Sequence, residues 1–293
     1  MVLSEIFFRR NAMKTCLIDV GGGLRGVYGA GVMDKCMDLG IVFDGCIGVS
    51  AGAGNLTSYL SGQRGRGYRF YFQYSFRPEY MSMGNFIRKG SYFDLDYVYG
   101  TLPRSDGENP LDYAAMKAHP ACGSFYIVAS EAESGKARYF TGNDLQLDDF
   151  EPIKASCAIP GLSRPIEIDG IRYFDGAISD PVPIRKAVEL GYDKIVLILT
   201  RPLNKLRDGS KDKLMANMIR KNFPMAAHNL TLRAKRYNDS VAYAKQLAAE
   251  GRVLILAPDD ITGIDTTKHS KESVMRMYGK GFRDANAIAD FLK

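Results

Sequence analysis

Long apolar runs are missing from this 293-residue sequence. No stretch approaches the 18 apolar residues of a membrane-spanning helix, and the charge-interrupted patch between Met1 and Lys14 is too short for a secretion signal. The five cysteines are odd in number and lack a C-x-x-C spacing, which argues against a disulfide framework or a zinc site. We therefore expect a cytoplasmic protein with buried thiols and no bound metal.

Internal repeats, linkers and low-complexity tracts are also missing. The composition, 46% apolar and 25% charged, is ordinary for a folded enzyme. A chain of this length can bury about three quarters of its unfolded surface. We therefore expect residues 1–293 to form a single domain.

Two segments have unusual side-chain patterns. Between Arg201 and Lys245 there are eleven lysine or arginine residues against three aspartates, an excess larger than the whole chain's net charge of +6. Such a segment can attract anionic lipid or nucleic acid, although a solvated helix face is the commoner explanation. Between residues 62 and 93, arginine alternates with tyrosine and phenylalanine, a pattern that can stack bases, line the entrance for a lipid-like substrate, or simply pack over a sheet. We expect at most a peripheral contact with an anionic membrane and no nucleic acid partner; the oligomeric state stays open.

Predicted strands and helices alternate along the chain. Strands are predicted over 15–20, 43–49, 123–132, 137–140, 171–174, 194–200 and 252–257, and helices over 27–39, 51–60, 181–190, 230–248 and 270–291. The nearly continuous apolar runs at 194–200 and 252–257 are typical of strands covered on both faces. The alternation predicts an α/β fold of three layers, α/β/α, with a largely parallel central sheet.

One serine lies where a strand is expected to turn sharply into a helix. Gly48-Val49-Ser50-Ala51-Gly52 has the G-x-S-x-G spacing of a nucleophile elbow, in which Gly48 and Gly52 leave space around the serine. A strained turn of this kind lifts the hydroxyl out of the sheet. Ser50 is therefore the candidate nucleophile.

A glycine loop follows the first predicted strand and allows two interpretations. Gly21, Gly23 and Gly26 fit the G-x-G-x-x-G fingerprint of a Rossmann-type dinucleotide site, but the acidic Asp44 precedes the second strand instead of following it. Alternatively, the backbone N–H groups of the loop form an oxyanion hole, where glycine lets a substrate approach the backbone closely.

The serine requires a base, and histidine is scarce. None of the three histidines follows a strand as in a Ser-Asp-His hydrolase, although position alone leaves His269 open. Asp175 is the better candidate, because a predicted strand ends there in a turn that contains glycine. Its carboxylate could reach the serine hydroxyl.

Four blocks together resemble the patatin-like phospholipase family. Residues Gly21, Gly22, Gly23, Leu24, Arg25 and Gly26 resemble the family's oxyanion loop, Gly48 to Gly52 its elbow, Asp175-Gly176-Ala177 its D-G-A/G block, and residues 155–161 the segment before that block. Two positions depart from the family pattern: Val20 precedes the glycines where an acidic residue is frequent, so no role passes to Asp19, and Asp180-Pro181 replaces Asn-x-Pro.

The resemblance implies a patatin-like α/β/α fold and hydrolysis of lipid acyl esters by a Ser-Asp dyad. Ser50 would be the nucleophile, Asp175 its base, and the loop from Gly21 to Gly26 the oxyanion hole. Arg25 would hold the loop, bind a substrate phosphate, or bond only to nearby carbonyls. No metal or cofactor would be required.

Overall fold

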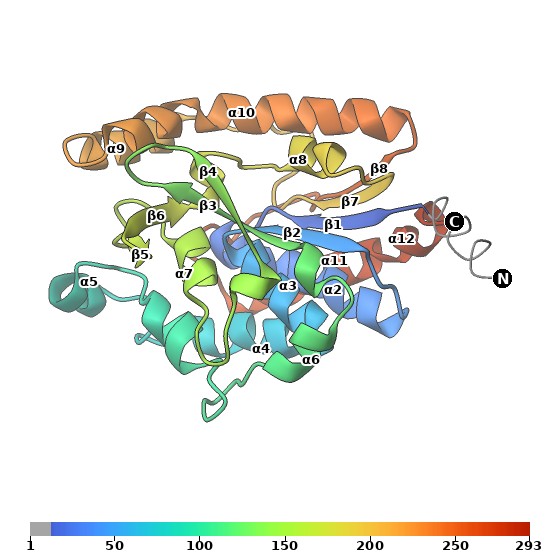
Figure 1. Ribbon diagram of the computed structural model, residues 1–293, viewed down its shortest axis with the longest axis horizontal. Coiled ribbons are helices and arrows are strands. Elements are labelled where there is room, and N and C mark those ends of the chain that lie inside the picture. Colours follow the sequence, from blue (N-terminus) through green and yellow to red (C-terminus); the bar gives the residue numbers. More distant parts are fainter. Residues whose placement is uncertain (1–12) are drawn as a thin grey trace.

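The computed structural model describes residues 13–293 and contains one eight-stranded sheet (Figure 1). The order is β5-β6-β3-β2-β1-β7-β8, and β4 also pairs with β3. The strands are β1 Thr15–Asp19, β2 Gly45–Val49, β3 Phe125–Glu131, β4 Ala137–Thr141, β5 Ile166–Ile168, β6 Ile171–Asp175, β7 Lys194–Ile198 and β8 Val253–Leu256. From β3 through to β8 all neighbours are parallel, whereas β4, β5 and β6 pair antiparallel.

Helices cover both faces of the sheet, so the predicted three-layer α/β/α fold is confirmed (Figure 1). One face carries α8 Ile184–Glu189 and α10 Pro224–Ala249, whose apolar residues pack on β1 and β7. The other face carries α2 Val27–Asp38, α3 Ala51–Leu60, α7 Glu151–Cys157 and α11 Lys271–Asp284. The remaining helices are α4 Arg66–Phe72, α5 Met83–Lys89, α6 Tyr113–Ala118, α9 Ser210–Ile219 and α12 Asn286–Phe291.

Two predicted helices differ from those observed. The helix expected over 181–190 begins only at Ile184. Val182 precedes a proline, and the proline ring disfavours helical backbone in the residue before it. The helix expected over 270–291 is two helices, α11 and α12, separated at Ala285, where ψ is −14°.

The five cysteines are buried thiols, as the apolar segments around them predict. Among residues 13–293, no helix combines the length and the apolar character needed to cross a membrane. The expectation for Met1 to Lys14 falls mostly on residues 1–12, which lie outside the described part. The cytoplasmic location stays a prediction from the sequence.

Candidate active site

Ser50 occupies a strained turn between β2 and α3. Its φ is 56° and its ψ is −132°, a conformation that residues with a side chain rarely adopt and that concentrates at functional sites. The flanking glycines allow the chain to pass close by. A Cβ on Gly48 would lie 2.5 Å from the Cα of Ala53, and one on Gly52 would lie 2.2 Å from the carbonyl oxygen of Asp19. Ser50 thus lies in a tight strand-to-helix turn.

The register of the sheet places Ser50 and Asp175 at the same height along the strands. Val49 pairs with Val128 in β3, and the next residue of β3, Ala129, pairs with Asp175 in β6. Ser50 and Asp175 therefore flank β3, with about 10 Å between their backbones, twice the spacing of neighbouring strands. The Ser50 hydroxyl is close enough to the Asp175 carboxyl to oppose the rise of its pKa, and among residues 13–293 no direct hydrogen bond joins the two side chains.

The direction of the strand that carries Asp175 to this position was not predicted from the sequence. The sequence predicts that a strand ends at Asp175 but not the direction of that strand, which is β6 and runs antiparallel to β3. It enters from beyond the carboxyl end of β3 and ends after three paired residues. Asp175 then begins a short 3-10 turn, Gly176–Ile178. A Cβ on Gly176 would lie 2.1 Å from the carbonyl oxygen of Val128, so this position also requires glycine.

The Asp175 carboxyl is almost completely enclosed, with 2% of the residue exposed. Burial raises its pKa, while the nearby Ser50 hydroxyl, the Ala177 N–H and the positive charges of Arg233 and Arg207 oppose that rise. The Ala177 N–H donates to Oδ1 at 2.8 Å. A carboxylate whose pKa lies above its ordinary range is a stronger base than an exposed one.

The segment from Ala155 to Gly161 supports both residues. The Ser50 N–H donates to the Ser156 hydroxyl at 2.8 Å, and the Asp175 N–H donates to the carbonyl oxygen of Ala158 at 2.9 Å. Between them, burial raises the pKa of the Cys157 thiol to about 12. This cysteine therefore stays protonated at neutral pH and does not compete with Ser50 as a nucleophile.

The glycine loop runs beside the elbow with unusual backbone angles. Gly21, Gly22 and Gly23 have φ of 63°, 127° and 63°, a region that strongly favours glycine. Within residues 13–293, we find no hydrogen-bond acceptor for the N–H groups of Gly22 and Gly23. Leu24 is buried in the core, and a Cβ on Gly26 would lie 2.4 Å from the Tyr71 hydroxyl. Leu24 and Gly26 therefore anchor the loop, and Gly23 lines the pocket beside Ser50.

Asp19 holds this loop, a role that the sequence comparison did not give it. Its Oδ1 accepts the Gly21 N–H at 2.8 Å, and its Oδ2 accepts the Asn55 side-chain amide at 2.9 Å. Burial raises the pKa of Asp19 to about 6, and these two hydrogen bonds oppose the rise. An acidic residue at the end of an otherwise apolar strand was the signal that could have revealed it.

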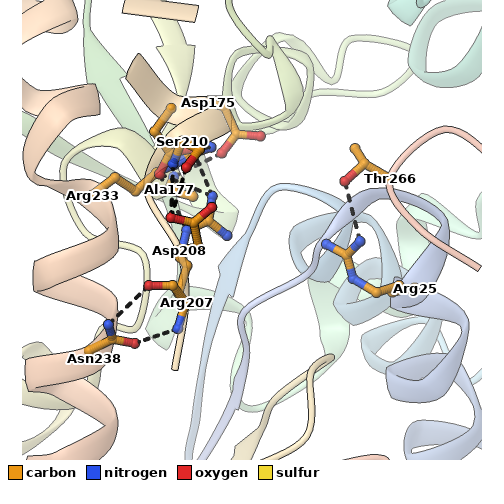
Figure 2. Close-up of polar contacts among 10 residues, drawn as sticks. Arg25, Asp175, Ala177, Arg207, Asp208, Ser210, Arg233, Asn238 and Thr266 are labelled. Atoms are coloured by element: carbon orange, nitrogen blue, oxygen red, sulfur yellow. Dashed lines mark hydrogen bonds and ion pairs between the residues drawn. The ribbon is translucent and has the colours of Figure 1, made fainter. Parts of the chain in front are cut away.

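Arg25 lies beside the loop with few partners. Only 4% of the residue is exposed, its Nε has no hydrogen-bond partner among residues 13–293, and Nη1 reaches the Thr266 hydroxyl at 3.4 Å (Figure 2). Burial, together with the positive charges of Arg201 and Arg207, lowers its pKa to about 9. A buried and unpaired cation at this place makes the surroundings of the loop strongly electropositive.

A second group of charges lies near Asp175. Both Arg207 and Arg233 bind the buried carboxylate of Asp212 (Figure 2). Asn238 of α10 fixes Arg207 through two hydrogen bonds with its backbone, 2.8 and 3.1 Å long. Because one carboxylate is shared by two guanidinium groups, positive charge remains beside Asp175. This part of the basic segment is therefore not simply a solvated helix face.

A pocket opens next to Ser50. One face of α3 forms a wall, with Ser50, Gly54 and Ser58 at helical spacing. Most other walls are aromatic or aliphatic: Phe70, Tyr71, Tyr80, Phe93, Leu95, Val98, Tyr99, Leu102, Leu111, Phe150, Ile153 and Ile159. Part of the aromatic and basic segment between residues 62 and 93 therefore lines a cavity, which is one of the three alternatives that the sequence leaves open.

The comparison with known protein families agrees with this geometry. Residues 20–188, over half of the chain, match the family model described as patatin-like phospholipase. The chain belongs to the patatin-like phospholipase family. The resemblance noted in the four sequence blocks is thereby confirmed. Residues 223–293 match a second model, a domain of unknown function, DUF6363.

Two individual relatives extend the comparison. The chain is 33% identical over 192 residues to the uncharacterized protein YjjU of Escherichia coli K12, covering 64% of this chain and 52% of that protein. It thus spans about half the length of this curated relative. The crystal structure of VipD from Legionella pneumophila aligns with a TM-score of 0.48 at 13% identity, over 95% of this chain and 67% of that one.

The histidines of this patatin-like chain are engaged elsewhere. His269 Nε2 lies 2.6 Å from the Ser75 hydroxyl and its ring stacks on Phe76, while His119 Nδ1 accepts the Ala121 N–H at 3.1 Å. His228 is exposed on α10. Across residues 13–293, no hydrogen bond joins a histidine to Ser50 or Asp175. No histidine that the structure describes is therefore placed to take the proton of Ser50.

The dinucleotide interpretation of the glycine loop finds no support in this patatin-like fold. The second strand ends at Ser50 in the elbow, where a ribose-binding carboxylate would be needed. Asp44 lies at the opposite end of that strand, where its carboxylate accepts the Thr15 N–H at 2.7 Å. In the described part of the chain, no group of three or more histidine, cysteine or acidic side chains is arranged to hold a metal.

Proposed function

We propose that this chain is a serine acyl hydrolase that cleaves a carboxylic ester of a lipid, with Ser50 as nucleophile and Asp175 as base. The observation that carries the proposal is that the strained Ser50, the buried Asp175 and the glycine loop lie at the same height across four neighbouring strands, β1, β2, β3 and β6. Family membership supports the lipid ester as substrate. We also infer one domain, because β8, in the second matched stretch, pairs with β7 in the same sheet.

The reaction would proceed through an acyl-enzyme. Asp175 takes the proton of the Ser50 hydroxyl as Oγ attacks the ester carbonyl carbon. The negative charge that forms on the carbonyl oxygen receives hydrogen bonds from the N–H groups of Gly22 and Gly23, and the field of Arg25 strengthens this stabilisation. Asp175 gives the proton to the leaving alcohol. A water molecule, deprotonated by Asp175, then hydrolyses the acyl-enzyme and restores Ser50.

Histidine replacement tests the dyad against a triad. We expect a variant with His119, His228 and His269 all changed to glutamine to hydrolyse p-nitrophenyl butyrate with kcat/KM within about threefold of the wild type, because none contacts Ser50 or Asp175. Removal of a true histidine base costs about 10²-fold or more. A loss of that size in the folded variant would contradict the dyad.

The pH dependence follows from the surroundings of Asp175. The base must be ionised, so kcat/KM should fall as the pH decreases through the raised pKa of Asp175, above the ordinary value of about 4. Arg207 favours the ionised form, so Arg207→Gln should move this acid limb to higher pH, by about half a unit. Lys235→Gln, at an exposed ion pair with Asp239, is the matched control and should leave the limb in place. A shift to lower pH in Arg207→Gln would contradict this assignment.

The pocket predicts a limit on acyl-chain length. Ser50 and Ser58 are eight residues apart along α3, about 12 Å. At Ser58 the pocket meets Arg66, whose Nη1 donates to the Ser58 hydroxyl at 3.1 Å and whose Nη2 donates to the carbonyl oxygen of Asn109 at 2.9 Å. An extended alkyl chain advances about 1.25 Å per carbon, given a bond of about 1.5 Å, so about nine or ten carbons fill this length.

We therefore expect kcat/KM for p-nitrophenyl esters to rise from acetyl to octanoyl or decanoyl and to fall by about tenfold at palmitoyl, because longer chains meet the polar Arg66 group. Rates measured below the micellar concentration of each ester test this. An undiminished rate for the palmitoyl ester would show that the pocket does not end at Arg66.

A further inference from the structure

Two short helices on one side of the molecule expose apolar side chains. On α5, Met83, Phe86 and Ile87 are exposed, with 79% of Ile87 accessible. On α9, Leu214 and Met218 are 65% and 59% exposed. Figure 1 shows both helices at the same end of the molecule, with β5 and β6 between them. Large apolar side chains in such number on neighbouring elements mark a surface that contacts something other than water.

A single loop connects these helices to each other. The Tyr92 and Phe93 N–H groups, just after α5, donate to the carbonyl oxygen of Leu162 at 2.7 and 3.2 Å. On the other side of the loop, the Met218 side chain lies against Gly161, where an added Cβ would be 2.9 Å from its methyl group. The loop from residue 159 to 164 therefore joins α5 and α9 into one surface, which we call the α5/α9 face.

The same loop leads directly to the candidate active site. Ile159 and Phe93 line the pocket beside Ser50. The carbonyl oxygen of Ala158, the residue before the loop, accepts the Asp175 N–H. A molecule that covers the α5/α9 face would thus lie next to the pocket that is proposed to receive the acyl chain.

The exposed charges of α5 and α9 are basic, whereas β5 and β6 between the two helices, with the turn that joins them, add charges of both signs, Glu167, Asp169 and Arg172. Helix α5 contributes Arg88 and Lys89, and α9 with the two residues after it contributes four exposed basic side chains: Lys211, Lys213, Arg220 and Lys221. The acidic residue of α9, Asp212, is buried and bound by two arginines, and α5 has none. Exposed apolar side chains among basic ones are typical of protein surfaces that lie on anionic membranes.

We propose that the α5/α9 face docks on an anionic lipid bilayer and presents the pocket beside Ser50 to lipids in that layer. This inference rests on the proposed function, because that function gives the docking its biological role. The docking itself requires neither Ser50 nor Asp175. It assigns a membrane partner to the exposed basic residues of α9 and of the two positions after it.

Vesicle sedimentation with the full chain tests the proposal. The probes are vesicles of equal parts phosphatidylglycerol and phosphatidylcholine, and vesicles of phosphatidylcholine alone. We expect binding to the anionic vesicles that weakens as NaCl rises from 0.1 to 0.5 M, and at least tenfold weaker binding to the neutral ones. Changing Phe86, Ile87, Leu214 and Met218 together to serine should weaken anionic binding by about tenfold or more.

The matched control changes Val42 and Leu147, exposed apolar residues outside α5, α9 and the loop, to serine, and should bind like the wild type. The fourfold variant should hydrolyse the soluble p-nitrophenyl butyrate within about twofold of the wild type, which shows that it is folded. Ser50→Ala should bind vesicles normally, so a failure of the proposed chemistry is separable from a failure of docking. Absence of binding, equal binding to both vesicle types, or unchanged binding of the fourfold variant would each overturn the proposal.

Discussion

Ser50→Ala is expected to lower kcat/KM for ester hydrolysis by about 10⁴-fold or more, because no acyl-enzyme forms without the hydroxyl. Asp175→Asn should lower it by about 10² to 10⁴-fold, since an amide cannot accept the serine proton. The two changes combined should cost little more than Ser50→Ala alone, because the two groups act as one unit. Rates with p-nitrophenyl octanoate on purified variants measure all three effects.

Ser61→Ala is the matched control for these variants. Ser61 is also a buried serine, at the opposite end of α3, and its hydroxyl donates to the carbonyl oxygen of Ser58 at 3.1 Å. Its replacement should leave kcat/KM within about twofold and the unfolding temperature within a few degrees. If Ser50→Ala kept more than a tenth of the wild-type rate, Ser50 would not be the nucleophile.

The second large effect concerns folding at Gly52. A Cβ there would lie 2.2 Å from the backbone oxygen of Asp19 and 2.8 Å from its carbonyl carbon, so α3 and β1 must move apart. The clash is with backbone atoms, which cannot move aside as the end of a flexible side chain can. We expect Gly52→Ala to cost about 3 kcal/mol of unfolding free energy and to lower Tm by about 6 to 12 °C. Thermal unfolding followed by circular dichroism measures the change.

Gly123→Ala provides the comparison. Around its added Cβ the nearest atom is the Asn143 amide nitrogen at 3.7 Å, an ordinary contact, and its φ is not in the left-handed region. The Tm should change by no more than about 2 °C. Equal Tm values for Gly52→Ala and wild type would show that β1 and α3 are not in the close contact described.

The fold and the nucleophile could be predicted because their signals are local. Alternating apolar segments specify strands and helices, and Gly48, Ser50 and Gly52 carry the elbow within five residues. Asp175 could be named from the turn that follows it. Its place beside Ser50 could not be derived, because it depends on the antiparallel pairing of β6 with β3, and strand order is set by contacts between distant segments.

The residues that hold the site in place could not be predicted, for the same reason. Asp19 binds Gly21 and Asn55 from inside an apolar strand, and Ser156 accepts the Ser50 N–H across 106 positions of sequence. In the basic segment, the sequence shows an excess of charge. The sequence does not show that Arg207 and Arg233 both bind Asp212 near Asp175, because the fold determines which charged side chains lie next to each other.

Reaction with a fluorophosphonate, followed by peptide mapping, tests the central claim most directly. The probe forms a covalent bond only with an activated nucleophile, and its phosphoryl oxygen needs the same oxyanion hole as an ester carbonyl. We expect one modified peptide, carrying the label on Ser50, and at least tenfold slower labelling in Asp175→Asn. Labelling of a different residue, or no labelling while a known serine hydrolase reacts in parallel, would contradict the Ser50 and Asp175 dyad.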